Sequence, residues 1–461
     1  MSSHIYREYD IRGVADRDLT DEVVEAIGCG LAHMIPAGRA GGPKTIIVSK
    51  DCRLSGPRLF DALTKGLLRG GADVVDVGVG PTPMMYFSVH HLDADGGVMI
   101  TGSHNPKDEN GLKIMIGKAS FYGEQIQELA QRIAAGEFAS ANGSGTLTKK
   151  DLKSEYLAAV TAGIEIADTG LPFVIDAGNG SAGPLGVEAL EKVGLSPTTL
   201  FCDMDGTFPN HHPDPADAHS LETLIATVKE KDALVGLAWD GDGDRLGVVD
   251  RSGTIVWGDR LLALFARYAL KKQPGGKVIG DVKCSQTLFD DIAKHGGKPI
   301  MGRTGHSLIK SLMKKESAML AGEMSGHFFF ADRYFGFDDG IYAALRICEI
   351  VAKEGKSVIE LLADMPEPES TPELRVDCAD DVKFKVVEGV KQHFASKYDN
   401  VVDIDGVRVN HSDGAWGLVR ASNTSPKLVL RFEAPTAERL AEVKEETEST
   451  IQDVLTKADL S

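Results

Sequence analysis

The segment Thr45–Gly78, TIIVSKDCRLSGPRLFDALTKGLLRGGADVVDVG, contains the pattern that decides the fold. An apolar stretch typical of a strand is followed by a polar loop, an amphipathic helical stretch, a glycine stop and a second apolar strand. A strand, a helix and a strand of this combined length predict a βαβ unit. Such a unit places its strands in a parallel or mixed sheet with helices packed on it.

The same pattern occurs twice more, in FVIDAGNGSAGPLGVEALEKVGLSPTTLFCD from Phe173 and in KVIGDVKCSQTLFDDIAKHGGKPIMGRTG from Lys277. Three copies predict three similarly built α/β domains; one large doubly wound sheet is the alternative. In MPEPESTPE (365–373), proline and glutamate argue against both helix and strand. Beyond it, the alternation of strands and helices changes and predicts an α+β domain.

Small polar stretches at 141–146 and 251–254 indicate the other joints between domains. We therefore expect α/β domains at 1–150, 151–254 and 255–367, and an α+β domain at 368–461.

Composition and charge exclude several classes of protein. Of the 461 residues, 42% are apolar and 26% are charged, which is typical of a soluble globular protein. The chain has no membrane-spanning apolar run, and its first residues lack the apolar core of a signal peptide. A net charge of −18 argues against nucleic-acid and anionic-membrane partners. Six dispersed cysteines indicate reduced thiols and a cytoplasmic protein. Without heptads or an apolar tail, we expect a monomer.

The segment AWDGDGDRLG (238–247) places three aspartates at alternate positions between two strand-like stretches. Alternate residues of an extended chain point to the same side, and the two glycines allow the carboxylates to converge. With no fixed cationic partner evident in the motif, this arrangement favours a hard divalent cation. An EF-hand loop is excluded because its sixth and twelfth positions would be Arg245 and Arg251. A plain solvated turn remains an alternative.

Three further stretches carry polar groups suited to a phosphorylated ligand. GGVMITGSHNPKDENGLKIM (96–115) places Ser103 in a polar loop close to lysines. GEMSGHFFF (322–330) presents Glu323, Ser325 and His327, whose carboxylate and hydroxyl can bind sugar hydroxyls. RASNTSPKLVLRFEA (420–434) gathers hydroxyls, an amide and an arginine, which suit a phosphate. Each stretch taken alone also fits an ordinary loop.

A fourth motif gives a competing hypothesis. TTLFCDMDGTF (198–208) is similar to the nucleophile motif of the haloacid-dehalogenase-like phosphatases, with Asp203 as the nucleophile and Asp338-Asp339 as a later metal-binding pair. Those enzymes follow the motif with a helix, whereas PNHHPDP predicts a loop here. The adjacent pair His211-His212 is no metal site, because neighbouring side chains seldom face one ion.

Five motifs taken in order resemble those of the α-D-phosphohexomutases, most closely the bacterial phosphomannomutase/phosphoglucomutase group. They are YDIRG (9–13), TGSHNP (101–106), DGDGDR (240–245), GEMSGH (322–327) and RASNTSP (420–426). The resemblance covers essentially the whole chain. It implies four domains around a central cleft, three of one α/β topology and the last α+β, in agreement with the repeats above.

The resemblance also implies roles for individual residues. Ser103 would carry a phosphoryl group, and Mg²⁺ would be held by an oxygen of that phosphate with Asp240, Asp242 and Asp244. The reacting centre would be lined by Arg12, His104, Lys113, Arg245 and His306, with Lys113 and His306 as candidates for proton transfer. The sugar and its distal phosphate would contact Tyr9, Lys283, Glu323, Ser325, His327, Arg420, Ser422, Asn423 and Thr424.

The implied reaction moves a phosphoryl group from Ser103 to a hexose 1-phosphate and gives a 1,6-bisphosphate. This intermediate turns end for end and returns the other phosphate to the serine. Glucose 1,6-bisphosphate or mannose 1,6-bisphosphate would serve as activator. One hypothesis is that domain 4 opens and closes over the ligand on its proline–glutamate linker. Identical solution-scattering profiles with and without ligand would count against it.

The resemblance also bears on the choice of substrate. GEMSGH is similar to the version in mannose and glucose enzymes, whereas glucosamine mutases usually carry glutamine where Met324 stands. Contacts to the 3- and 4-hydroxyls would not distinguish glucose from mannose, so we expect dual specificity toward small phosphosugars. A phosphoglucosamine mutase, an aspartyl-phosphate phosphatase using Asp203 and a non-catalytic sugar-phosphate binder remain alternatives.

Overall fold

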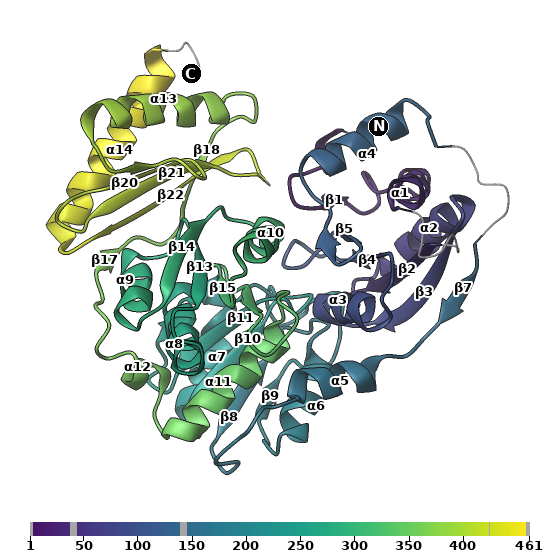
Figure 1. Cartoon of the computed structure of the whole chain (residues 1–461), viewed down its shortest axis with the longest axis horizontal. Coiled ribbons are helices and arrows are strands. Elements are labelled where there is room, and N and C mark those ends of the chain that lie inside the picture. Colours follow the sequence, from purple (N-terminus) through teal and green to yellow (C-terminus); the bar gives the residue numbers. More distant parts are fainter. Residues whose placement is uncertain (1–2, 37–43, 139–144, 424, 458–461) are drawn as a thin grey trace.

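The computed structural model describes residues 3–36, 44–138, 145–423 and 425–457, and these form four units, each with its own sheet (Figure 1). The prediction of three mixed-sheet α/β domains and a C-terminal α+β domain is confirmed. The alternative of one large doubly wound sheet is wrong, because the four sheets are separate.

The first unit follows from the repeat at Thr45. Its sheet has the order β1-β5-β4-β2-β3-β7, with β6 on β5, and strand β2 is parallel to both β3 and β4. The strands are β1 (Ile11–Val14), β2 (Lys44–Lys50), β3 (Ala72–Val79), β4 (Gly96–Ile100), β5 (Glu109–Ile116), β6 (Ala119–Ser120) and β7 (Leu147–Lys149). The helices are η1 (Ser3–Ile5), α1 (Asp21–Met34), α2 (Gly56–Arg69), α3 (Thr82–His91) and α4 (Glu124–Ala134).

Helices α1 and α2 pack backbone against backbone. A Cβ atom at Gly66 would lie 2.0 Å from the carbonyl oxygen of Glu25, so this close crossing requires glycine. The side chain of Thr20 starts α1 by accepting the N–H of Val23.

The second and third units repeat the plan. The second sheet has the order β12-β11-β10-β8-β9 and the third β14-β13-β15-β16. The second contains β8 (Phe173–Asp176), β9 (Thr198–Leu200), β10 (Val235–Trp239), β11 (Leu246–Asp250) and β12 (Ile255–Val256), with α5 (Lys153–Thr161), α6 (Gly183–Lys192), η3 (Ala218–Leu221) and α7 (Glu222–Lys231). The third contains β13 (Lys277–Asp281), β14 (Lys298–Gly302), β15 (Leu320–Gly322) and β16 (Phe328–Phe330), with α8 (Gly258–Lys272), α9 (Gln286–Lys294), α10 (His306–Glu316), α11 (Gly340–Glu354) and α12 (Val358–Leu361).

In each of these three sheets, an antiparallel hairpin follows directly on the parallel strands. The hairpins are β4–β5, β10–β11 and β15–β16. The loops that close them carry the motifs TGSHNP, DGDGDR and GEMSGH. Equivalent positions in three similar domains therefore explain why motifs so far apart in the sequence belong together.

The fourth unit has an antiparallel sheet with the order β17-β22-β21-β20-β19, and β18 also pairs with β22. Its elements are β17 (Glu369–Ser370), β18 (Leu374–Asp377), β19 (Val401–Val402), β20 (Val407–Asn410), β21 (Trp416–Ala421), β22 (Lys427–Ala434), α13 (Lys383–Lys397) and α14 (Ala437–Lys457). The prediction that 365–373 contains no strand is wrong, because β17 pairs with the end of β22. A two-residue edge strand tolerates neighbouring prolines that a central strand would not.

Domains 3 and 4 share a buried polar contact. The guanidinium of Arg408 stacks 3.8 Å from the centre of the Trp416 ring and donates to the carbonyl oxygens of Val282 and Cys284, both at 2.7 Å. Burial lowers the pKa of Arg408 to about 10. Trp416 also packs with Val282 and Leu418. Domain 4 is thus anchored on the strand ends of domain 3. None of the helices described is long and apolar enough to cross a membrane.

Candidate active site

Ser103 lies in the loop after β4 and is buried, with a left-handed backbone (φ 50°). Its Oγ donates to Oδ2 of Asp240 at 2.7 Å and lies 3.1 Å from Nδ1 of His104. Burial and the charges of Arg245 and Arg12 hold the pKa of His104 well below its usual value. The serine of domain 1 is therefore in direct contact with the aspartate loop of domain 2.

The shape of the serine loop depends on Arg53, which sequence analysis missed. This buried guanidinium donates to the carbonyl oxygens of Ser103, Asn105, Pro106 and Glu109 at 2.5–2.9 Å. A single side chain thus satisfies four carbonyl groups that the irregular loop leaves without backbone partners. Arg53 lies in the loop after β2. No motif in the sequence places it near the serine loop, so this contact could not be predicted.

The three aspartates of the DGDGD loop are fully buried, and one carboxylate oxygen from each lies within 4.8 Å of the others. Burial and the neighbouring Asp242 and Asp244 raise the pKa of Asp240 well above its usual value. Oδ1 of Asp242 and Oδ1 of Asp244 have no hydrogen-bond partner among the described residues. Two buried carboxylate oxygens without donors fit a hard cation such as Mg²⁺.

The glycines of this loop have separate roles. A Cβ atom at Gly241 would lie 2.3 Å from the carbonyl oxygen of Ser103, and Gly243 has a φ of +72°. The first glycine allows the two loops to touch, and the second allows the turn. The hydroxyl of Thr82, at the start of α3, donates to Oδ2 of Asp242 and fixes this carboxylate.

The expectation that the aspartates have no cationic partner is wrong. Nζ of Lys113, on β5 of domain 1, lies 2.7 Å from Oδ2 of Asp242 and 2.5 Å from Oδ2 of Asp244. Burial lowers the pKa of Lys113, but the two carboxylates more than offset this effect and raise it. The sequence concealed the pair because it joins residues that are 129 and 131 positions apart in two domains.

Arg245 follows the aspartates and links them to the GEMSGH loop (322–327), the predicted sugar loop. Its N–H donates to Oδ1 of Asp240 at 3.1 Å, and its Nε donates to Nε2 of His327 at 3.0 Å. Nδ1 of His327 lies 3.0 Å from Oδ2 of Asp338, a buried residue outside the motifs assigned to the site. Three loops of domains 2 and 3 are therefore joined in one chain of contacts.

In the predicted sugar loop, the two carboxylate oxygens of Glu323 have different surroundings. Oε1 of Glu323 accepts the N–H of Gly305 at 2.6 Å, whereas its buried Oε2 has no hydrogen-bond partner in the described part of the chain. Burial raises the pKa of Glu323. Ser325 is half-buried in the same loop. Oε2 of Glu323 is thus suited to accept a ligand hydroxyl.

The N-terminal motif YDIRG lies between domains 1, 3 and 4. The hydroxyl of Tyr9 donates to the carbonyl oxygen of Thr304 at 2.7 Å and accepts Nδ2 of Asn423 at 2.5 Å. Burial raises the pKa of Tyr9 to about 12. Arg12 donates to the carbonyl oxygen of Gly102 at 2.8 Å and so faces the serine loop.

The turn between β21 and β22 carries the predicted phosphate-binding residues. Arg420 donates to Oδ2 of Asp405, and the hydroxyls of Ser422 and Ser425 are 2.9 Å apart. The buried Lys383, also missed from the sequence, donates to the carbonyl oxygen of Ser425 at 3.0 Å. Lys283 pairs with Glu373 of the linker at 3.0 Å. Thr424 lies outside the described residues.

The motif at Asp203 does not form a phosphatase site. Asp203 is exposed, and turns and bends follow it where a helix would be required. Oδ1 of Asp205 accepts both the N–H and the hydroxyl of Thr207. His211 contacts Asp176, with Nε2 at 3.0 Å from Oδ1. Asp339 caps α11 by accepting the N–H of Tyr342.

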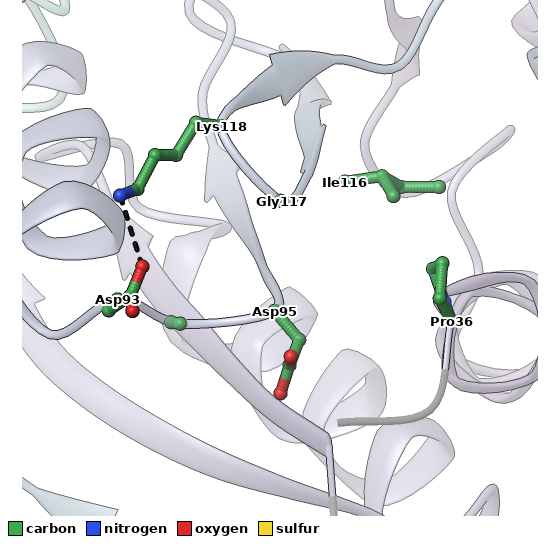
Figure 2. Close-up of a pocket in the computed structure, with 7 residues that line it drawn as sticks. Pro36, Asp93, Asp95, Ile116, Gly117 and Lys118 are labelled. Carbon is green, nitrogen blue, oxygen red and sulfur yellow. Dashed lines mark ion pairs between the residues drawn. The ribbon is translucent and has the colours of Figure 1, made fainter. Parts of the chain in front are cut away.

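A surface hollow of about 440 Å³ lies at the other end of β4 and β5 (Figure 2). It is lined by Pro36 after α1, by residues 93–95 before β4 and by residues 116–118 at the end of β5, whereas Ser103 follows β4. Asp93 pairs with Lys118 at 3.0 Å, and Asp95 accepts the N–H of Thr45. Its charged groups are engaged with one another and with the backbone, so we do not assign the reaction to this hollow.

Four family models match successive parts of the chain. They are the phosphoglucomutase/phosphomannomutase alpha/beta/alpha domains I (residues 3–140), II (154–253) and III (257–368) and the C-terminal domain (373–449). The chain is 45% identical over 444 residues to a phosphomannomutase/phosphoglucomutase of Pseudomonas aeruginosa, covering 96% of this chain and 94% of that protein. It is 44% identical over 455 residues to a phosphoglucomutase of Neisseria meningitidis, covering 98% and 97%.

A crystal structure of a phosphoglucomutase/phosphomannomutase family protein from Burkholderia thailandensis superposes with a TM-score of 0.90 at 41% identity and covers 98% of both chains. A phosphomannomutase-like structure from Thermus thermophilus, at 22% identity and a TM-score of 0.80, shares the fold.

Proposed function

Because the chain belongs to the phosphoglucomutase/phosphomannomutase family, we propose that its joined loops interconvert hexose 1-phosphate and hexose 6-phosphate through a phosphate carried on Ser103. The enzyme is a mutase of the α-D-phosphohexomutase superfamily. The observation that supports the serine most strongly is its buried hydroxyl. It donates to Asp240, beside two carboxylate oxygens that have no hydrogen-bond partner in the described part of the chain.

Asp240, Asp242 and Asp244 would hold Mg²⁺ together with an oxygen at Ser103. When bound there, the ion would neutralise the carboxylates and withdraw charge from the phosphoryl group. In the forward step, the bond between phosphorus and the serine Oγ breaks while a bond from a sugar oxygen to phosphorus forms. The proton that the sugar hydroxyl loses is balanced by the one that the serine Oγ gains, so the serine is left as a hydroxyl. The reverse step, on the other phosphate, regenerates the phosphoserine.

Lys113 is better suited to give a proton than to take one. Its ion pairs with Asp242 and Asp244 hold it in the charged ammonium form. Arg12 and Arg245 bring guanidinium groups to the serine loop and the aspartate loop, where they can bind phosphate oxygens.

We propose mannose and glucose phosphates as substrates, with the corresponding 1,6-bisphosphate as activator. Oε2 of Glu323 is suited to a sugar hydroxyl, and glucose and mannose differ only at C2. Met324 stands where glucosamine mutases usually have glutamine, so a phosphoglucosamine mutase is the second candidate. We propose Arg420, Ser422, Asn423 and Thr424 for the phosphate that is not reacting.

A coupled assay tests the proposal, with glucose 1-phosphate and mannose 1-phosphate in parallel, Mg²⁺ and a trace of glucose 1,6-bisphosphate. We expect turnover of both sugars, and we expect Ser103→Ala to lose at least roughly 10³-fold in kcat, the scale seen when a nucleophile is removed. Ser88→Ala is a matched control, because the Ser88 hydroxyl is buried in α3 and donates to the Met84 carbonyl. Mass spectrometry should find acid-stable phosphate on Ser103. Undiminished turnover in Ser103→Ala, or a hydroxylamine-labile phosphate on Asp203, would contradict the proposal.

A further inference from the structure

Two histidine rings of domain 3 stack at the reacting centre. His306 begins α10 and His327 ends the sugar loop, and their ring centres are 5.6 Å apart with the planes at 19°. Both side chains are buried. A neutral imidazole has one nitrogen that donates and one that accepts, so the chemistry of each ring depends on which nitrogen holds the proton.

Lys310 lies one helical turn after His306 and has three acceptors around its ammonium group. Nζ is 2.8 Å from Oδ1 of Asp338, 3.3 Å from Nδ1 of His306 and 4.1 Å from the centre of the Tyr86 ring. An ammonium group has three protons and no acceptor capacity. A carboxylate, an imidazole nitrogen and an aromatic face thus match its three donors.

This arrangement fixes the proton on His306. Because the nearest partner of Nδ1 is a donor, Nδ1 accepts and the proton of the ring lies on Nε2. The carboxylate of Asp338 is 3.7 Å from Nδ1 of His306, but its Oδ2 is closer to His327, at 3.0 Å. Burial and the charge of Lys310 also hold the pKa of His306 well below its usual value, which keeps the ring neutral.

Nε2 of His306 is then a buried donor without a hydrogen-bond partner among the residues described. His327 has the opposite arrangement: its Nε2 accepts from Arg245, so its proton lies on Nδ1, at 3.0 Å from Oδ2 of Asp338. Lys310 and Arg245, each donating to one ring, therefore give two adjacent histidines opposite tautomers. One ring positions an arginine, and the other presents an N–H.

We infer that Lys310 is a positioning residue, which holds His306 as the Nε2–H tautomer so that this N–H donates to an oxygen of the bound sugar phosphate. The inference rests on the proposed phosphohexomutase function. It changes the role expected for His306, because a neutral N–H donor stabilises charge on a phosphate oxygen and does not remove a proton from the sugar hydroxyl.

Lys310→Met tests this inference, because methionine keeps the apolar stem and removes the donor. Among the described residues, the carboxylate of Asp338 is then the polar group left beside Nδ1 of His306, so we expect the proton to move to Nδ1. Nitrogen-15 NMR of the resting enzyme distinguishes the tautomers, and His306→Gln assigns the signals. Wild type should show an unprotonated Nδ1 and a protonated Nε2, and Lys310→Met should show the reverse.

The kinetic readout uses the mutase assay. We expect Lys310→Met to lose about 10²-fold in kcat, the scale of one lost transition-state donor, with little change in KM. Lys310→Arg restores a charged donor and should recover most of the activity and the wild-type tautomer. Lys314→Met, an exposed lysine one turn further along α10, is the matched control and should match wild type in both measurements. Thermal melting and circular dichroism verify that each variant is folded.

The same Nδ1 signal in wild type and Lys310→Met would overturn the inference. A changed tautomer with an unchanged kcat would overturn the catalytic link. Should Lys310→Met fail to fold, Lys310→Leu also removes the donor, and an unprotonated Nδ1 that persists there at wild-type kcat would overturn the inference equally. The NMR measurement needs no turnover, so its failure can be distinguished from failure of the proposed mutase activity, which the Ser103→Ala assay tests.

Discussion

The hydroxyl of Ser103 donates to Oδ2 of Asp240 over 2.7 Å, and this contact joins two domains across 137 positions of sequence. It places the oxygen that would carry phosphate directly beside the carboxylates that would hold the cation. Neither loop alone forms the site, because Gly241 must approach the serine carbonyl closely for the two to meet.

Metal binding should depend on Asp242 and on the residue that orients it. We expect Asp242→Asn to abolish Mg²⁺ binding in calorimetry and EDTA to abolish turnover until Mg²⁺ is restored. Thr82→Val removes the hydroxyl that holds Asp242 and should weaken Mg²⁺ binding about 10-fold, as for other partners of metal ligands.

Asp364→Asn is the control for this prediction. Asp291, His295 and Asp364 form another group of potential ligands, but Arg267 pairs with both carboxylates at 2.6 and 2.7 Å. Their charge is already compensated, so the substitution should leave Mg²⁺ affinity unchanged. Equal loss of Mg²⁺ affinity in Asp364→Asn and Asp242→Asn would show that the aspartate loop is not the metal site.

Glu323 should contribute equally to the turnover of glucose 1-phosphate and of mannose 1-phosphate. Glu323→Gln replaces a carboxylate that accepts from Gly305 and leaves Oε2 for a ligand hydroxyl. Removing a charged acceptor should lower kcat/KM by roughly 10- to 10²-fold for glucose 1-phosphate and for mannose 1-phosphate. Glu316→Gln, in a half-exposed ion pair with Lys277, should have no effect. A loss confined to one sugar would mean that Glu323 reads the 2-position.

Tyr9→Phe should loosen the junction of domains 1, 3 and 4. The hydroxyl makes hydrogen bonds to Thr304 and Asn423, and their loss should raise KM by about 10-fold and increase the radius of gyration of the ligand-free enzyme in X-ray scattering. Tyr6→Phe is the matched control, since the buried Tyr6 hydroxyl has no hydrogen-bond partner among the described residues. If the two variants behave alike, the hydroxyl of Tyr9 does not hold the domains together.

Asp339 should make stability depend on pH. Burial raises its pKa from 3.8 to about 6. As pH rises from 4 to 6, the unfolded chain loses this proton first, so the folded state becomes less favourable by up to about 3 kcal/mol, and the penalty is constant above pH 6. Asp339→Asn lacks the penalty. Its melting temperature relative to wild type should increase between pH 4 and 6 and then level off; a constant difference would contradict the assignment.

The sequence predicted the elements and the loops of the site better than the contacts between them. The βαβ repeats and the five motifs are local patterns, and the structure places the motif loops at the same hairpin in three domains. The pairing of Lys113 with Asp242 and the four carbonyl contacts of Arg53 depend on how domains and loops pack. No spacing within one segment encodes them.

The same limit applies to Lys310 and Asp338. Lys310 follows His306 by one helical turn, a spacing that a helix prediction could have used. Asp338 comes from another loop of domain 3 and was interpreted only as part of a phosphatase-like pair. Its position between two histidines emerges only when the fold is assembled.

The left-handed backbone of Ser103 has a consequence for engineering. Such a conformation costs an L-residue about 1 kcal/mol and costs glycine almost nothing. A thermostabilisation programme that scores torsional strain would therefore select glycine at position 103 and discard the reactive oxygen. Stability and activity oppose each other at this residue, and sequence optimisation should leave it fixed.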